Sequence, residues 1–270
     1  MLGARTHFWE YGDPSGPPLV LVHGFRGDHH GLELIAQRLP GYRVIVPDLP
    51  GFGISEAFPE HRHDLDGYAT WLISFVAELG LERCFVLGHS FGSLVVSAAI
   101  AAGLTPERTV LVNPIAAPAL AGPKRLMTQL AVLYYRAGAA LPGALGSALL
   151  ASPLIVRVMS ETMAKTRDPE LRAWIHDQHA RYFSLFSDRQ TVSEAFGASI
   201  SATVRDFAPT FSAPTLLIAA ERDDITPLAA PLALHRELPG SELRIVPGVG
   251  HLIHYEAPDD AAAWITEFLA

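Results

Sequence analysis

A serine framed by glycines, in the pentapeptide Gly88-His89-Ser90-Phe91-Gly92, is the feature that most constrains how this chain can fold. An apolar run at residues 84–87 precedes it, and a helical pattern at residues 93–102 follows it. A strand that reverses at once into a helix crowds the neighbouring side chains and strains the central residue, so glycine is needed two places away on either side. The segment therefore predicts a nucleophile elbow with Ser90 as the chemical centre of the chain.

Short apolar runs alternate with helical patterns along most of the sequence. Continuous rather than alternating runs of Val, Ile and Leu suit strands covered on both faces, as in a parallel sheet wrapped by helices. Such strands are expected at residues 19–22, 43–46, 84–87, 109–112, 215–219 and 243–246. Helices are expected at residues 32–39, 68–79, 93–102, 229–238 and 259–269. The pattern predicts an α/β architecture with a doubly wound, mostly parallel sheet.

One long segment interrupts this alternation. Between residue 114 and about residue 211 no comparable strand pattern occurs, and the sequence is helical in character throughout. An insertion directly after the C-terminal end of a strand lies where α/β folds bind their ligands. We therefore predict a helical cap at residues 115–211, inserted into a core domain formed by residues 1–114 and 212–270.

Composition excludes several classes of protein. A chain of 270 residues that is 49% hydrophobic can bury a large core. Its net charge of -8 and its scattered basic residues favour neither nucleic acid nor an anionic membrane as partner. The single cysteine, Cys84, cannot form an internal disulfide and is expected to be a buried small hydrophobe. Oligomeric state is not predicted.

Apolar segments are interrupted by prolines or charges before they reach membrane-spanning length, and the start of the chain lacks the apolar segment of a secretory signal. We therefore expect a cytoplasmic protein without stable membrane insertion. The longest apolar region, residues 137–156, contains Pro142 and Gly143, Gly146 and Pro153, and we expect another element to cover it.

Nucleophilic use of Ser90 requires a base and a carboxylate that orients the base. Among twelve histidines, His251 follows the last predicted strand in a glycine-rich loop that can reach Ser90, and this position favours it over His254. Asp223 and Asp224 follow the preceding strand; we favour Asp223 as the orienting group and assign Asp224 to the following turn. The resulting order of serine, acid and histidine is that of α/β-hydrolases.

An oxyanion formed at Ser90 needs hydrogen-bond donors, usually two backbone N–H groups. The amide of Phe91 follows the nucleophile directly. The amide of Phe25, in His23-Gly24-Phe25, lies in the loop after the strand at residues 19–22, where a second donor is expected. We predict these two amides as the oxyanion hole.

Taken together, these motifs resemble α/β-hydrolase-fold serine hydrolases, the large group that contains esterases, lipases and C–C bond hydrolases. Besides the elbow, the likeness rests on His23-Gly24-Phe25, Asp48-Leu49-Pro50-Gly51-Phe52-Gly53, Asp223-Asp224-Ile225-Thr226-Pro227 and Gly250-His251-Leu252-Ile253-His254-Tyr255-Glu256-Ala257-Pro258. The resemblance implies an α/β-hydrolase fold over nearly the whole chain. It also implies that residues 48–53 form a structural loop, so Asp48 is given no catalytic role.

The resemblance removes some activities and weakens others. Relatives that dehalogenate or open epoxides carry aspartate where this chain has Ser90, so those reactions are not expected. Relatives that cleave ring-fission C–C bonds commonly have asparagine and glycine where His89 and Ser93 stand. Members that carry the acid after the strand at residues 109–112 would have it at Asn113, which favours Asp223 as the acid.

We expect a carboxylesterase, a serine hydrolase that cleaves an ester with an apolar acyl or alkoxy group through an acyl-enzyme on Ser90. A small apolar ester and water are then the only partners, and no cofactor is needed. The apolar residues of the cap predict an apolar substrate pocket or an apolar entrance to it. The substrate-binding predictions are Tyr134, Leu130, Leu154, Phe183 and Phe186.

Three alternatives stay open. A C–C bond hydrolase of a ring-fission diketone or dienoate would use the same triad but needs a cation for the substrate carboxylate. The cap offers Arg136, Arg157, Arg167 and Arg181. An acyltransferase on the same triad would differ only in its acceptor. The fold could also serve as a ligand receptor with little turnover.

Metal binding is not predicted. The pairs His29-His30 and His61-x-His63-Asp64 have ligand-type residues, but neither has a convincing third ligand nearby in the sequence. Solvated loop residues are the preferred interpretation of both.

Overall fold

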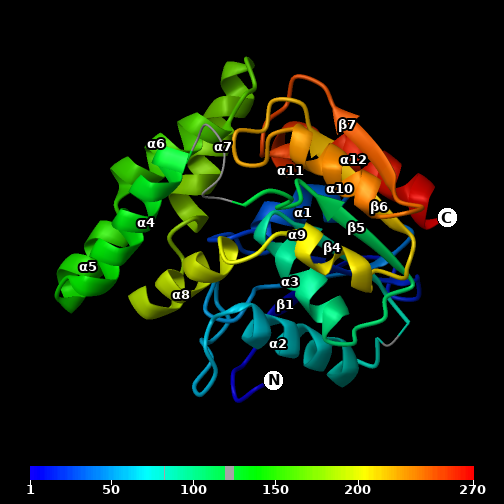
Figure 1. Cartoon of the computed structure of the whole chain (residues 1–270), viewed down its shortest axis with the longest axis horizontal. Helices are drawn as coiled ribbons and strands as arrows, with labels where there is room; N and C mark the ends of the chain where they lie inside the picture. Colours follow the sequence, from blue (N-terminus) through cyan, green and yellow to red (C-terminus); the bar gives the residue numbers. More distant parts are fainter. Residues whose placement is uncertain (82, 119–124) are drawn as a thin grey trace.

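A seven-stranded sheet forms the centre of the computed structural model, which describes residues 1–81, 83–118 and 125–270 (Figure 1). The strands are β1 (Phe8–Gly12), β2 (Pro18–Val22), β3 (Arg43–Pro47), β4 (Phe85–His89), β5 (Arg108–Val112), β6 (Thr215–Ala220) and β7 (Glu242–Val246). Their order is β1-β3-β2-β4-β5-β6-β7. Strands β2 to β7 pair in parallel, and β1 pairs antiparallel with β3. The predicted doubly wound, mostly parallel sheet is confirmed.

Strand β1 was not predicted. Its sequence, FWEYG, alternates between exposed and half-buried residues instead of forming a continuous apolar run. This pattern arises because β1 lies at the edge of the sheet and pairs only with β3. An edge strand of five residues with one solvent-exposed face lacks the continuous apolar run that marks the central strands.

Helices cover both faces of the sheet. The core helices are α1 (His30–Ala36), α2 (Leu65–Glu78), α3 (Phe91–Ala101), α10 (Ala229–Glu237), α11 (Ile253–Glu256) and α12 (Pro258–Leu269). Helices α2, α3 and α10 contribute to one large apolar cluster, whereas α1 and α12 contribute to a second. Along β2, Val20 and Val22 belong to the first cluster and Leu19 and Leu21 to the second. Burial on both faces explains the continuous apolar runs of the sequence.

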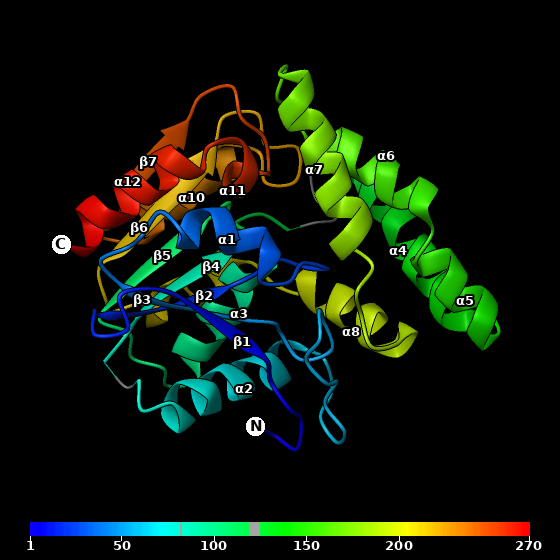
Figure 2. The ribbon, with the colours of Figure 1, turned by 180° about the vertical axis from the view of Figure 1, so that it is seen from behind.

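Most of the described residues between β5 and β6, in the range predicted for the cap, form the helices α4 to α8. They are α4 (Arg125–Ala140), α5 (Gly143–Leu150), α6 (Pro153–Met163), α7 (Pro169–Tyr182) and α8 (Arg189–Ser199). Figure 2 shows them grouped on one side of the core. Asp168 and Asp188 begin α7 and α8 by accepting hydrogen bonds from first-turn amides, which explains where these helices start.

The end of the predicted cap range makes contacts with the core. Helix α9 (Val204–Phe207) and the 3-10 helix Ala208–Thr210 pack on α3, and the amide of Val204 donates a hydrogen bond to the carbonyl oxygen of Ile115. The first part of the predicted range, residues 119–124, lies outside the described residues. A division that counts residues 204–211 with the core agrees with these contacts.

One described stretch, Gly143–Met163, is long and apolar enough to cross a membrane by length and composition. The structure divides it into α5 and α6 at Ala151 and Ser152. Only 22% of its most apolar window is buried. The expectation that another element covers the apolar region at residues 137–156 is therefore wrong for the part of the chain that the structure describes.

Candidate active site

Ser90 lies at the sharp turn between β4 and α3. Its backbone angles, φ 53° and ψ -117°, fall in a region that non-glycine residues rarely adopt. A Cβ atom at Gly88 would lie 2.5 Å from the carbonyl oxygen of Gly92, and one at Gly92 would lie 2.1 Å from that of Val22. These clashes explain why glycine stands on both sides of the strained serine.

The structure brings Ser90, His251 and Asp223 together from three separate strand ends. Nε2 of His251 lies 2.7 Å from Oγ of Ser90, and Nδ1 of His251 lies 2.8 Å from Oδ2 of Asp223. Since a carboxylate only accepts hydrogen bonds, Nδ1 carries the proton, and Nε2 is left to accept from the serine hydroxyl. All three side chains are buried. The arrangement can remove the proton of Ser90.

Asp223 is the most extensively hydrogen-bonded member of this group. Besides His251, Nδ2 of Asn113 and Oγ1 of Thr226 donate to its Oδ2 at 2.9 and 2.7 Å. The amides of Ile225 and Thr226 donate to its Oδ1. Burial would raise the pKa of Asp223, but the neighbouring His251 and the hydrogen bonds from His251 and Thr226 hold that pKa well below its usual range. The carboxylate therefore stays ionised.

Asp224 makes a contact with the cap that was not predicted. The turn after β6 is capped by Oδ1 of Asp223, whereas Oδ2 of Asp224 lies 2.5 Å from Nζ of Lys165 in the cap. Asp223 therefore both orients His251 and caps the turn, and a capping role for Asp224 stays a prediction. Asp224 links the core to the cap.

Asn113 is a site residue that sequence reasoning missed. It stands at the end of β5, the position where some relatives carry the acid, and its own backbone has a positive φ of 47°. Its amide nitrogen donates to Asp223, so it supports the acid from the neighbouring strand. Its place directly after a predicted strand was the available signal.

His254, the competing histidine, does not reach the nucleophile. It lies in α11 with its ring centroid 4.2 Å from that of His89. Burial, and then the nearby His89, hold the pKa of His254 well below its ordinary value. Its Nδ1 has no hydrogen-bond partner among the described residues. The structure brings His251, and not His254, to Ser90.

The loop that carries Phe25 lies against the elbow. A Cβ atom at Gly24 would lie 3.3 Å from Cβ of Ser90. His23 holds this loop in place, because its Nδ1 donates to the carbonyl oxygen of Gly24 and its Nε2 accepts from the amide of Leu49, both at 2.8 Å. Burial lowers the pKa of His23, which keeps the ring neutral for these two bonds.

The backbone N–H groups of the two predicted oxyanion donors, Phe25 and Phe91, make no hydrogen bond among the described residues. Phe91 is the first residue of α3, so its N–H has no partner within the helix. Two N–H groups beside Ser90 are therefore available to a ligand.

Aromatic rings surround Phe25. Its ring centroid lies 5.6 Å from that of Tyr135, 5.9 Å from that of Phe196 and 6.0 Å from that of Phe52. Tyr135 and Phe196, from α4 and α8, stack at 4.0 Å. Sequence analysis missed both residues, because only the helical phase of α4 separates the buried Tyr135 from the neighbouring Tyr134.

The five predicted substrate-binding residues have different positions. Leu130 and Leu154 are 52% and 73% exposed, so the structure does not bring them to the buried Ser90. Tyr134 lies within the cap, where its hydroxyl donates to the carbonyl oxygens at the end of α5. Phe183 and Phe186 lie 4.8 and 5.4 Å from the guanidinium carbon of Arg26.

Arg26 joins the loop of Phe25 to the cap. It is 1% exposed, yet within the described residues no carboxylate pairs with it. Its Nε donates to the carbonyl oxygen of Phe183 at 2.9 Å, and its Nη2 donates to that of Leu150 at 2.8 Å. These carbonyls end α7 and α5, where helix dipoles concentrate partial negative charge. Two helix ends therefore compensate the buried cation.

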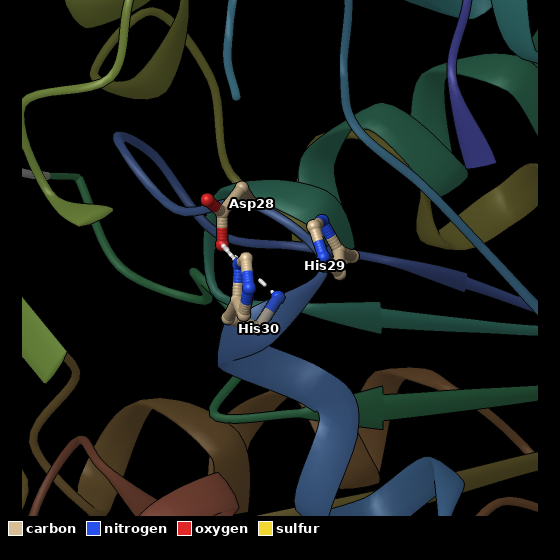
Figure 3. Close-up of side chains that lie close together, drawn as sticks. All are labelled: Asp28, His29 and His30. Atoms are coloured by element: carbon tan, nitrogen blue, oxygen red, sulfur yellow. Dashed lines mark hydrogen bonds and ion pairs between the residues drawn. The ribbon is translucent and has the colours of Figure 1, made fainter. Parts of the chain in front are cut away.

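The pair His29-His30, for which no metal is predicted, has Asp28 as a third potential ligand nearby. Asp28, His29 and His30 each place one donor atom within 4.8 Å of the others (Figure 3). Nδ1 of His29 lies 2.9 Å from Oδ1 of Asp48, and Nδ1 of His30 lies 3.1 Å from Oδ1 of Asp28. In Figure 3 the second oxygen of Asp28 points away from His29. Hydrogen bonds between rings and carboxylates account for this cluster, and the absence of a metal stays a prediction.

The second pair has structural partners. Nε2 of His63 accepts from the amide of Phe58 at 3.2 Å, and Asp64 begins α2 by accepting from the amide of Gly67. His61 is exposed. Buried and capping contacts, rather than the expected solvated loop, explain His63 and Asp64.

The sequence matches the model of the alpha/beta hydrolase family over residues 19–264. The chain belongs to this family. One relative of this alpha/beta hydrolase is the dihydrolipoyllysine-residue acetyltransferase component of the acetoin cleaving system of Pseudomonas putida, 31% identical over 99% of this chain and 68% of that protein. Another is the 2-hydroxy-6-oxononadienedioate/2-hydroxy-6-oxononatrienedioate hydrolase of Klebsiella pneumoniae, 28% identical over 98% of this chain and 91% of that protein.

Solved structures agree with the family. An esterase from Thermogutta terrifontis superposes on this alpha/beta hydrolase with a TM-score of 0.77 and 25% identity, covering 98% of this chain and 92% of that one. An esterase from Exiguobacterium antarcticum covers 99% of this chain and 96% of its own with a TM-score of 0.80 and 19% identity, and so shows the shared fold. Because the family houses several activities on one fold, the substrate has to be argued from the site.

Proposed function

We propose that this alpha/beta hydrolase is a carboxylesterase, a serine hydrolase that cleaves an ester with an apolar acyl or alkoxy group. The observation that carries the proposal is the buried line from Asp223 through His251 to Ser90, with contacts of 2.8 and 2.7 Å. The free amides of Phe25 and Phe91 beside Ser90 supply the second requirement, donors for an oxyanion.

The reaction follows from these positions. Oγ of Ser90 attacks the ester carbonyl carbon while its proton passes to Nε2 of His251, and Asp223 stabilises the imidazolium. The two backbone amides stabilise the oxyanion, each by about 2.7–4 kcal/mol of barrier. His251 then protonates the departing alcohol, which leaves an acyl-enzyme on Ser90. A water molecule, deprotonated by His251, attacks this ester and releases the acid and the free serine.

An apolar substrate is supported by the rings beside the oxyanion loop. Phe25 and Phe196 are partly exposed and lie next to the buried Tyr135. An acyl chain placed against these rings would lose contact with water, at about 25 cal/mol for each Å² of apolar surface. The ratio kcat/KM should therefore rise with acyl length until the acyl chain extends beyond the rings of Phe25, Tyr135 and Phe196.

A C–C bond hydrolase is the second candidate, because one relative is named for that reaction. Such an enzyme needs a cation for the carboxylate of its substrate. The four cap arginines predicted for this role, Arg136, Arg157, Arg167 and Arg181, are all exposed. Arg157 and Arg181 pair with Glu161 and Asp177 in their own helices. This distribution favours the ester as substrate.

An acyltransferase would use the same acyl-enzyme and pass the acyl group to an alcohol or an amine. The relative from Pseudomonas putida is named as an acetyltransferase component, which makes this acceptor question worth a direct measurement. Turnover of one ester in water containing a competing alcohol separates the two, because the ratio of acid to transferred ester reports the acceptor.

Fluorophosphonate labelling followed by mass spectrometry tests the nucleophile, with Ser90→Ala as the matched control. We expect one adduct, on Ser90, that is absent from the variant. The same preparations are then assayed with p-nitrophenyl esters of increasing acyl length and with a ring-fission dienoate. Activity confined to the dienoate would replace the ester by the C–C substrate, and labelling elsewhere than Ser90 would refute the proposed nucleophile.

A further inference from the structure

The cap contains an exposed apolar region that the proposed reaction does not use. Helices α4, α5 and α6, residues 125–163, are called the cap arm here. Among the described residues, eleven large apolar side chains are strongly exposed, and six of them belong to this arm. They are Leu130, Leu133, Leu141, Leu145, Leu154 and Val158, with exposed fractions between 38% and 73%. Such a concentration of exposed apolar side chains marks an interaction surface.

The arm is also placed where a large partner can reach it. Figures 1 and 2 show α4, α5 and α6 side by side, extending away from the sheet, with α5 farthest from the core. Leu130 and Leu133 are three residues apart on α4, and Leu154 and Val158 are four apart on α6, so each pair shares one side of its helix.

Charge separates the arm from the rest of the molecule. The arm, residues 125–163, has three basic residues, Arg125, Arg136 and Arg157, and one acidic residue, Glu161, which gives it a net charge of +2. The whole chain carries -8, so the remainder carries -10. The net charge of the chain therefore conceals a segment that is both apolar and cationic, and one of its arginines, Arg157, pairs with Glu161.

These properties point to one kind of occupant. Basic residues beside exposed leucines are the composition of helices that lie in the surface of an anionic bilayer. A second copy seated arm to arm would bring cations against cations. A helix across the bilayer needs about 20 continuous residues, whereas α5 and α6 have 8 and 11 and are separated at Ala151 and Ser152. The arm can lie on a membrane surface without crossing it.

We propose that the cap arm docks the protein on anionic lipid surfaces. Its leucines enter the boundary between headgroups and acyl chains, and the exposed Arg136 faces the lipid phosphates. Docking stands apart from the proposed catalysis, because the arm lies outside the group of Ser90, His251 and Asp223. Binding is therefore expected to be the same for the Ser90→Ala variant.

Flotation of the full chain with vesicles tests this docking. We expect binding to vesicles of phosphatidylcholine mixed with phosphatidylglycerol, little binding to phosphatidylcholine alone, and weaker binding in high salt. Leu145→Gln and Leu154→Gln should each lower the partition coefficient by about tenfold, since a leucine that leaves water is replaced by an amide. Arg136→Gln should lower it by about fivefold. The control is Ile54→Gln, a side chain 59% exposed but in the core domain, which should leave binding unchanged.

The same experiment can overturn the proposal in three ways. Absence of binding to either vesicle refutes it, as does equal binding of Leu154→Gln and the unaltered chain. Equal binding to neutral and anionic vesicles would refute the role of the arginines. Light scattering after gel filtration tests whether a second copy of the chain binds the arm instead. A dimer that Leu145→Gln dissociates, together with no vesicle binding, would assign the surface to a second copy.

Discussion

Buried histidines occur both at the active site and at the junction between the cap and the core, but their hydrogen bonding differs. His251 has a partner on each ring nitrogen, Ser90 on one side and Asp223 on the other. At the junction, Nδ1 of His254 has no partner among the described residues. The histidine of the active site is thus held by hydrogen bonds on both ring nitrogens, whereas His254 at the junction packs against the rings of His89 and Tyr255.

On the cap side of the junction, a serine lies between two histidines. Oγ of Ser160, in α6, lies 2.6 Å from Nδ1 of His176 and 2.7 Å from Nδ1 of His179, both in α7. The ring of His179 lies 5.8 Å from that of Tyr255 in α11 of the core. Burial lowers the pKa of His179 to about 4 and that of His89 to about 3. The contrast teaches that His251 is placed to exchange a proton with Ser90, whereas burial disfavours the protonated form of His179 and His89.

The largest expected effect comes from replacing His251 and His254, one at a time, by alanine. His251→Ala should lower kcat for an ester on the order of 10⁴–10⁶-fold, because the serine loses its base. His254→Ala should keep kcat within about tenfold, since its ring does not contact the reacting atoms. Steady-state kinetics on both variants is the measurement. A severe loss in His254→Ala, with His251→Ala active, would reverse the assignment of roles.

The second test uses the two adjacent aspartates. Asp223→Asn should lower kcat on the order of 10⁴-fold, because the amide cannot hold the Nδ1–H tautomer of His251. Asp224→Asn weakens a partly exposed ion pair with Lys165, and such pairs contribute about 0–1 kcal/mol. Equal losses in kcat would contradict the assignment of Asp223 as the acid.

The third test concerns the attachment of the cap. Arg26→Met keeps an unbranched apolar stem but removes the guanidinium, so the carbonyls of Phe183 and Leu150 lose their donor, which should cost about 2 kcal/mol of unfolding free energy. Arg181→Met is the control, because Arg181 is exposed and its ion pair is with Asp177 in its own helix. Chemical denaturation and limited proteolysis of the cap are the measurements. If Arg26→Met were no less stable than the control, the proposed tie between loop and cap would be refuted.

Much of the fold could be predicted from the sequence because burial on two faces leaves a strong pattern. The strand predicted at 215–219 falls within β6, whose residues are all buried, since continuous runs of Val, Ile and Leu between turn residues are typical of buried parallel strands. Strand β1 could not be predicted from an apolar run, because one of its faces is exposed to solvent. The pairing of Ser90 with His251 could be anticipated, since both follow strands whose C-terminal ends meet at one edge of the sheet.

The sequence could not predict contacts that depend on rotation about a helix axis or on meetings between distant helices. Tyr135 rather than Tyr134 faces Phe25, and a phase difference of one residue in α4 decides this. Arg26 meets α5 and α7 only because the cap folds back over the loop, which no local pattern records. The prediction that Leu154 binds substrate rested on hydrophobicity alone, and hydrophobicity does not separate a pocket from an exposed arm.

The smallest expected effect is on the pH dependence of stability. A histidine whose pKa is depressed on folding binds no proton in the native chain, but binds one in the unfolded chain below about pH 6.5. Its contribution to stability is complete above that pH and is lost progressively as the pH falls toward the depressed pKa. Each such ring therefore adds a slope of about 1.4 kcal/mol per pH unit near pH 5.

His254→Phe isolates one of these rings. Phenylalanine keeps an aromatic side chain against His89 and Tyr255 but cannot take up a proton, so the slope of unfolding free energy near pH 5 should fall by about 1.4 kcal/mol per pH unit. Tyr255→Phe is the matched control, because burial raises the pKa of Tyr255 further above this range and its loss removes no proton. Urea denaturation between pH 7 and pH 5 measures both. An unchanged slope in His254→Phe would mean that this ring is already protonated in the folded chain, and the junction would then be held by charge rather than by neutral packing.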